Sequence, residues 1–166
     1  MPIHITSNAR SLTIKPTTKY ELRDIIWEEI KRQGPDADLN HIDTSLITDM
    51  SMLFGMITIG NIKVDQWEVS NVTNMRHLFC GCLKFNCDLS KWDVSNVTNM
   101  ENMFDCCIKF NRDLSKWDVS NVTDMSGMFY NCPIMESYKP KFNNDAMSSD
   151  RVDELNRIMR QLFGYR

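Results

Sequence analysis

Apolar and polar positions repeat with a period of 25 residues through the middle of the chain. Trp67, Trp92 and Trp117 share one position of this period, and Ile42 lies one period earlier. No insertion separates the copies, so we identify a tandem repeat over residues 39–142. Other apolar positions recur in the same phase: Val69, Val94 and Val119; Met50, Met75, Met100 and Met125; Phe54, Phe79, Phe104 and Phe129; Cys82, Cys107 and Cys132.

Each repeat predicts two short elements. The first apolar group has the spacing of a short strand and its turn, as in leucine-rich repeats: Leu89, Trp92, Val94 and Val97. The second group has helical spacing behind an N-cap at Thr98, with an acid at Glu101: Met100, Met103, Phe104 and Cys107. One such unit cannot bury both of its faces, so we expect successive units to stack.

The two ends of the chain read as caps for this stack. Residues 1–38 predict a strand at 11–15 and then a helix, which begins at the capping box of residues 18–21 and ends at Gly34. Residues 143–166 predict a capping helix from Ser149, with one apolar face: Val152, Leu155, Ile158, Met159, Leu162 and Phe163. We therefore expect a single α/β domain over residues 1–166, a leucine-rich-repeat-type solenoid of about four strand-turn-helix units with helical caps at both ends.

The repeat phrase resembles a known family. Residues 92–100 (WDVSNVTNM), followed by Phe104, Cys107 and Phe110, are similar to the BspA-like leucine-rich-repeat proteins of bacteria. The resemblance covers residues 39–142. It implies a strand-plus-helix solenoid used for interaction, and many members are surface-anchored adhesins with host-protein partners. The chain shows no signal peptide, lipidation cysteine near its start or wall anchor.

Composition and charge exclude several classes of protein. The chain has 166 residues, of which 42% are hydrophobic and 25% charged, which is typical of a folded protein rather than a disordered one. The net charge is −3, so no global basic field favours nucleic acid, and no apolar run is long enough to insert into a membrane. Because no signal peptide is visible, we take the cytoplasm as the default location, and a surface or secreted location is the alternative that the resemblance implies.

An exposed sheet face is the candidate site. Residues 37–138 hold 7 lysines and arginines against 13 acids, and four of these acids fall in one row of the repeat. If Trp92 and Val94 point inward, their neighbours point outward, and the candidate partner-binding residues are Asp43, Glu68, Lys91, Asp93, Lys116 and Asp118. The face would accept a basic peptide or a cation. The alternative is a solvated surface on which the two lysines pair with the acids.

The remaining recurring residues favour structural roles. We expect the Trp, Phe and Met rows to be core, and we expect Asn71, Asn96 and Asn121, with Asn86 and Asn111, to form ladders that satisfy turn backbone. Cys82, Cys107 and Cys132 share one position and favour buried, reduced thiols. Cys80, Cys87 and Cys106 lie outside that row, so a thiol-bound metal and a disulfide stay open as alternatives.

No enzyme motif is present in the sequence. His4, His41 and His77 belong to three different settings, and there is no phosphate-binding glycine loop or nucleophile elbow. We therefore expect no catalysis and no cofactor. The leading prediction is a non-enzymatic module that binds a protein partner, not nucleic acid, with a monomer favoured. The alternatives are a self-assembling structural protein and a thiol-based metal or redox sensor.

Overall fold

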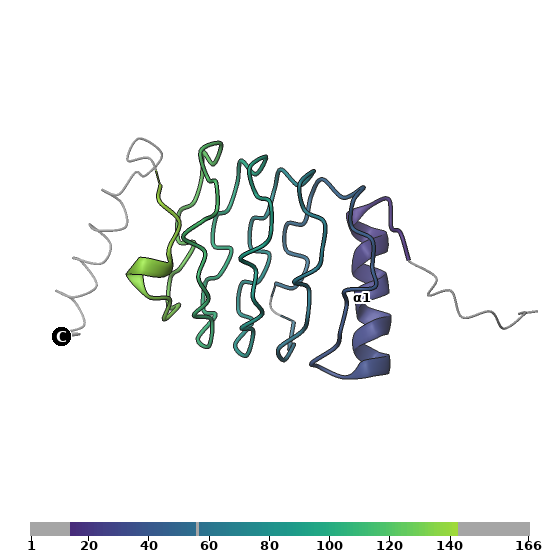
Figure 1. Cartoon of the computed structure of the whole chain (residues 1–166). Coiled ribbons are helices and arrows are strands. Elements are labelled where there is room, and N and C mark those ends of the chain that lie inside the picture. Colours follow the sequence, from purple (N-terminus) through teal and green to yellow (C-terminus); the bar gives the residue numbers. More distant parts are fainter. Residues whose placement is uncertain (1–13, 56, 143–166) are drawn as a thin grey trace, which may run out of the picture.

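The structure is a computed structural model that describes residues 14–55 and 57–142. Figure 1 shows the chain winding through successive coils that lie side by side in a row. The helix α1 (Lys19–Gln33) lies across one end of the row, and the short 3-10 helix η1 (Glu136–Tyr138) lies near the other end. Neighbouring coils are in register at 25 residues, as in the parallel bridges between Asn74 and Asn99 and between Asn99 and Asp124.

The predicted fold class is wrong. Within the described residues, the repeats contain neither the predicted strands nor the predicted helices, and no β-sheet is formed. Outside α1 and η1, regular pairing is limited to isolated parallel bridges: Ile14–Ile42, Asp38–Lys63, Asp49–Asn74, Asn74–Asn99 and Asn99–Asp124. The protein is therefore not a strand–helix leucine-rich-repeat solenoid but a stack of coils built almost wholly from turns.

The helix predicted after Thr98 does not form because its N–H groups alternate between two kinds of partner. Asn102 and Cys106 have φ of 53° and 58°, which lie in the left-handed region and cannot continue an α-helix. Every second N–H group donates to the next coil at 2.7–2.9 Å: Met100 to Asp124, Asn102 to Ser126, Phe104 to Met128 and Cys106 to Tyr130. The N–H groups between them close tight turns onto carbonyls three residues earlier: Met103 to Met100, Asp105 to Asn102 and Cys107 to Phe104.

The strand predicted at residues 89–97 is a succession of tight turns. The N–H of Trp92 donates to the carbonyl of Leu89 at 3.0 Å, and the N–H of Val97 donates to that of Val94 at 2.9 Å. These bonds join residues three apart in the same coil, so they are not rungs between strands. The apolar side chains still face the core. The turns, and not the alternating geometry of a β-strand, point them inward.

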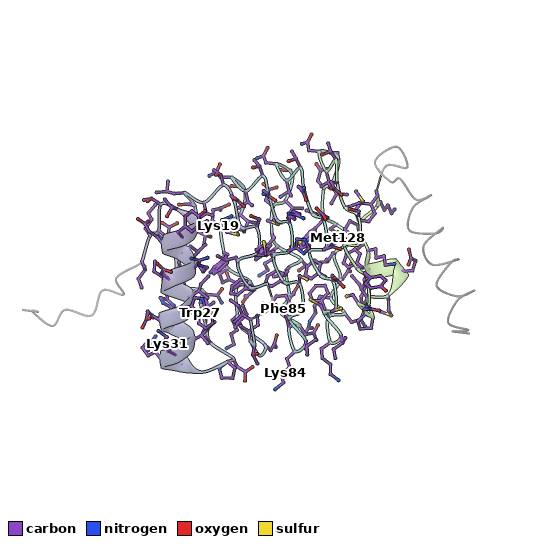
Figure 2. The ribbon with its side chains drawn as sticks, turned by 180° about the vertical axis from the view of Figure 1, so that it is seen from behind. Lys19, Trp27, Lys31, Lys84, Phe85 and Met128 are labelled. Carbon is purple, nitrogen blue, oxygen red and sulfur yellow. The ribbon has the colours of Figure 1, made fainter. Side chains whose placement is uncertain are left out.

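The core runs the length of the stack as rows of identical residues. The rings of Phe54, Phe79, Phe104 and Phe129 stack with centroids 5.4–5.6 Å apart. Phe85 and Phe110 form a second stack with a centroid distance of 5.8 Å, and Figure 2 shows Phe85 inside the body of coils. Trp67, Trp92 and Trp117 are 4–5% exposed, so the prediction that the Trp and Phe rows are core is confirmed.

The helix α1 closes the first coil. The Thr18 hydroxyl caps it by accepting the N–H of Glu21, and Gly34 ends it with φ of 91° and an N–H bond to the carbonyl of Ile30. Leu22 and Ile26 are fully buried against the core. The predicted helix and its limits are therefore confirmed. The capping box is shifted by one residue, because the Glu21 carboxylate accepts from Thr17 rather than from Thr18.

Two predicted elements fall wholly or largely outside the described residues. The capping helix of residues 143–166 lies outside them entirely. Of the predicted strand at 11–15, only Ile14 and Lys15 are described, and Ile14 forms an isolated bridge with Ile42.

Candidate functional site

Each coil contains turns in which a side-chain oxygen accepts the N–H of the residue two positions later. The oxygen belongs to Asp or Asn, or to Glu at one position, and the bonds are 2.8–3.1 Å long. Such turns compete with helix and strand, which explains why these residues give neither. Three rows of acceptors result: Asp88 and Asp113; Asp43, Glu68, Asp93 and Asp118; and Asp49, Asn74, Asn99 and Asp124.

The second row, Asp43, Glu68, Asp93 and Asp118, is the acidic row of the candidate site. Each carboxylate accepts the N–H of the serine two residues later, and hydrogen bonds from the hydroxyl group and then from the backbone N–H of that serine lower the pKa of all four groups. Like charges in the row act in the opposite direction: Asp93 and Asp43 raise the pKa of Glu68, and Asp118 raises that of Asp93. The carboxylates are therefore ionised at neutral pH and repel one another along the row.

Only one end of the acidic row is neutralised within the described residues. Lys15 Nζ lies 3.0 Å from Asp43 Oδ2, and the hydrogen bonds from Ser45, with a smaller contribution from Lys15, lower the pKa of Asp43 to about 2. No lysine, arginine or histidine nitrogen of the described part lies within 4.0 Å of the carboxylates of Glu68, Asp93 or Asp118. The exposed carboxylates of Glu68, Asp93 and Asp118 thus form a line of three negative charges along the stacked coils.

Lys91 and Lys116 lie apart from the acidic row. They line a polar groove of about 500 Å³ together with Asp88, Ser90, Asn111, Arg112, Asp113 and Tyr138. Lys91 lowers the pKa of Asp65 and Asp88 through its charge, but it is not among the groups that perturb Asp93. The six candidate site residues therefore divide into an acidic row and a neighbouring groove, and within the described residues neither lysine forms an ion pair with the row.

The groove residues Asp88, Arg112 and Asp113 were not predicted from the sequence as site residues. Arg112 Nε donates to the carbonyl of Asn86 at 2.8 Å, which holds the guanidinium across two coils. Asp88 and Asp113 are 25 residues apart, and each precedes a serine by two positions. That recurrence was the available signal for a second acidic position in these two successive repeats.

The rows are held in register by side-chain ladders. Asn71, Asn96 and Asn121 each donate from Nδ2 to a serine carbonyl of the preceding coil at 2.7–2.9 Å. Asn86 and Asn111 take part in the second ladder, in which the side-chain oxygen of one coil accepts an N–H of the next. The predicted asparagine ladders are confirmed, although the first three side chains are exposed rather than buried.

The cysteines are all free in this structure. Cys82 and Cys107 are fully buried and donate to the carbonyls of Phe54 and Phe79, while Cys132 is half-buried. Burial raises the pKa of Cys82 to about 12 and raises that of Cys107 further still. Cys80 and Cys106 are half-buried beside Asp105. Within the described part of the chain, no three His, Cys, Asp or Glu residues form a group that could hold a metal ion.

The two described histidines, His41 and His77, lie in different environments. His41 Nε2 lies 3.7 Å from a carboxylate oxygen of Glu29 on α1, and His77 occupies a turn position with φ of 55°. His4 lies outside the described residues. One further row has a structural role in turns. Each side chain of this row accepts the N–H of the residue two positions later, as expected for turn chemistry: Asp49, Asn74, Asn99 and Asp124.

The family comparison matches most of the chain. Residues 27–145 match the family described as Mycoplasma protein of unknown function, DUF285. The chain belongs to this family. No curated protein and no solved structure matches it. Among the described residues, no helix has the length and apolar character that a membrane crossing requires.

Proposed function

We propose that this DUF285 protein is a non-enzymatic module that binds a partner protein through the acidic row and the loops beside it. The observation that carries the proposal is the line of ionised carboxylates of Glu68, Asp93 and Asp118, none of which pairs with a cation of residues 14–55 or 57–142. Like charges held side by side destabilise the free protein, and a partner that brings positive charge removes that repulsion. The resemblance of the repeats to BspA-like proteins supports an adhesin-like or effector-like role.

The spacing of the coils favours a particular kind of partner. Equivalent residues of neighbouring coils recur at about the distance of the stacked Phe rings, whose centroids are 5.4–5.6 Å apart. Lysines or arginines three or four residues apart on an α-helix are separated by about 4.5–6 Å along its axis. A basic helix lying along the stack would therefore place successive cations opposite Glu68, Asp93 and Asp118.

We expect the affinity of the acidic row for its partner to be modest. The acidic row contains no aromatic residue and no arginine, which are the residue types that dominate tight interfaces. Exposed charge pairs contribute about 0.2–1 kcal/mol each, and salt screens them. We therefore expect binding in which the row supplies attraction and orientation, while Lys91 and Lys116 in the groove contact acids at the edge of the partner.

Binding by matched charge variants tests the proposal. Asp93→Asn/Asp118→Asn removes two charges from the acidic row, and Asp88→Asn/Asp113→Asn removes two charges from the groove in the same two coils. Both variants keep the turns, because Asn74 and Asn99 already accept the equivalent N–H groups in this chain. Partners are captured from host lysate and from extracellular matrix, and each captured protein is titrated at low and moderate salt.

The two variants have different expected outcomes. A partner of the acidic row loses about three- to thirtyfold in affinity with Asp93→Asn/Asp118→Asn and little with Asp88→Asn/Asp113→Asn, and its binding weakens as salt rises. A partner that is affected only by the groove variant, or equally by both, overturns the assignment to the row. Circular dichroism and urea unfolding of both variants confirm that each one is folded.

A further inference from the structure

The polar groove of about 500 Å³ joins two neighbouring coils to the end of η1. Its lining recurs with the 25-residue period in two pairs of charged residues: Asp88 with Asp113, and Lys91 with Lys116. Tyr138 of η1 is fixed beside them, because its carbonyl oxygen accepts a backbone N–H of the second coil at 2.8 Å. Figure 1 shows η1 at the end of the row of coils opposite α1. The groove is therefore built by the repeats together with the segment that follows them.

The three cations of the groove have no ion-pair partner among the described residues. No carboxylate oxygen of residues 14–55 or 57–142 lies within 4.0 Å of the side-chain nitrogens of Lys91, Arg112 or Lys116. Arg112 is nevertheless held in place, because its Nε donates to the carbonyl of Asn86 at 2.8 Å. Like charges that line one groove repel one another, and an anion bound between them removes that repulsion. The groove is therefore suited to a negatively charged group.

The groove also contains two ionised carboxylates. Asp88 and Asp113 each accept the N–H of the serine two residues later at 2.9 Å, and hydrogen bonds from that serine lower the pKa of both groups. The nearby charges of Arg112 and Lys91 lower the pKa of Asp88 further. A carboxylate has room for several hydrogen bonds, so both groups can still accept from a ligand. Three cations and two carboxylates leave the groove with a net charge of +1 and with strong acceptors.

These two sets of groups disfavour the simplest ligands. A bare cation is repelled by the three positive charges, and a bare phosphate or sulfate ion is repelled by the two carboxylates. A ligand that suits all five groups carries a negative charge and, beside it, hydroxyl groups that donate to the carboxylates. Sugars with an acidic substituent have this composition. The volume of the groove lies in the range of sites for small organic ligands and is large enough for a short oligosaccharide.

Two uncharged side chains of the groove fit the same kind of ligand. Tyr138 is half-buried, so its ring offers an apolar face to the C–H groups of a sugar, and its hydroxyl group offers a donor. Asn111 accepts the N–H of Met135 through Oδ1 at 3.0 Å, which leaves its Nδ2 group as a donor. Charged, polar and aromatic groups thus meet in one groove.

We infer that this groove is a second binding site, separate from the acidic row, and that it binds a carbohydrate that carries a carboxylate or sulfate group. Lys91, Arg112 and Lys116 bind the acidic group of the sugar. Asp88 and Asp113 accept its hydroxyl groups. The site is independent of the partner proposed for the acidic row, because it attracts the opposite charge.

Calorimetric titration of the full chain tests the class of ligand. The acidic probes are a heparin tetrasaccharide, which carries sulfates and carboxylates, and a hyaluronan tetrasaccharide, which carries carboxylates alone. The controls are a neutral tetrasaccharide of N-acetylglucosamine and inorganic sulfate. We expect at least one acidic tetrasaccharide to bind about tenfold or more tightly than either control.

Matched lysine variants locate the site. Lys91→Gln/Lys116→Gln removes two charges from the groove, whereas Lys84→Gln/Lys109→Gln removes two charges from exposed lysines that are likewise 25 residues apart but do not line it. Figure 2 shows Lys84 at the lower edge of the coils. We expect the first variant to weaken binding of the acidic tetrasaccharide by about three- to thirtyfold, and the second to change it by less than about twofold.

Four results would overturn the assignment. Equal binding of the neutral tetrasaccharide means that the groove does not recognise charge. Displacement of the acidic tetrasaccharide by inorganic sulfate at equal concentration means that it binds a bare anion only. Equal losses in the two lysine variants mean that surface charge in general attracts the probe. Absence of binding by both acidic probes at millimolar concentration means that the groove is not a carbohydrate site.

Two controls complete the experiment. Asp93→Asn/Asp118→Asn should not weaken binding of the acidic tetrasaccharide, so a failure of the acidic row as a protein-binding site leaves this result unchanged. Circular dichroism shows whether each variant is folded. If a double lysine variant is not folded, Lys116→Gln and Lys109→Gln replace the pair, and the same comparison decides the outcome.

Discussion

The indole N–H of Trp92 donates to the carbonyl oxygen of Val64 at 3.0 Å, across to the preceding coil. The equivalent tryptophans make the same bond: Trp67 to Leu39 at 2.9 Å and Trp117 to Leu89 at 3.0 Å. Each ring is thus a core side chain and also a clamp between two coils. The bond explains why this position holds tryptophan rather than another large apolar residue in three successive repeats.

Replacement of Trp92 by alanine should lower the free energy of unfolding by about 3–5 kcal/mol, because a large cavity forms and the Val64 carbonyl loses one of its two donors, keeping only the N–H of Trp67. Trp92→Phe retains part of the ring volume and should cost less than Trp92→Ala. Urea unfolding followed by circular dichroism measures both. A loss below about 1 kcal/mol for Trp92→Ala would mean that the ring is exposed in solution.

The sequence was sufficient to predict the repeat register and the rows of the core. The 25-residue recurrence of Trp92, Phe104 and Met100 places like residues on one another whatever the local conformation. The helix α1 was also predictable, because its N-cap, apolar face and terminal glycine all agree. Both features follow from patterns that can be read in a single sequence: the 25-residue recurrence and the start, apolar face and end of a helix.

The conformation within each coil was not predictable in the same way. Left-handed residues interrupt the expected helix, but one row of them holds Met52, His77 and Asn102, and only Gly127 in that row signals such a conformation. The arrangement of the candidate site residues was difficult to predict for a related reason. Residues two apart share a face only in a strand, and the turn closed by Asp93 and Ser95 breaks that rule. The four acids share one row in the structure, whereas Lys91 lines the neighbouring groove.

Substitution of Gly127 by alanine should destabilise the protein by about 1–2 kcal/mol. Gly127 has φ of +64°, and a Cβ built on it would clash with Asn102 Oδ1 in the preceding coil. Thermal or urea unfolding of Gly127→Ala, Asn102→Ala and the double variant separates the two causes. The double variant should recover the part due to the clash and retain the backbone strain. Purely additive losses would contradict the contact.

The free energy of unfolding should decrease at acidic pH, partly because Asp43 becomes protonated. Its pKa is lowered from 3.8 to about 2, so folding favours the ionised form. The stabilisation is therefore complete above about pH 4 and is lost as the pH falls toward about 2. Asp43→Asn keeps the turn acceptor and removes the ionisation. Urea midpoints of wild type and variant between pH 5.5 and pH 2.5 should converge as the pH falls, whereas parallel curves would show that Asp43 is unperturbed.

The cysteines should react with a thiol reagent in two groups. Cys80, Cys106 and Cys132 are half-buried, whereas Cys82, Cys87 and Cys107 are buried. Burial also raises the pKa of Cys82 to about 12, so at pH 8 only about one molecule in ten thousand carries its thiolate. Time-resolved alkylation followed by peptide mass spectrometry should therefore label the first group before the second.

The same experiment tests the thiol-sensor alternative. The six free cysteines of the structure predict six reactive thiols after denaturation, both with and without prior reductant. Two thiols that appear only after reduction would identify a disulfide. The half-buried Cys80 and Cys106 would then be the first pair to examine, because Cys106 lies close enough to raise the pKa of Cys80. Rapid labelling of Cys82 or Cys107 in the native protein would instead show that the core opens far more readily than its packing indicates.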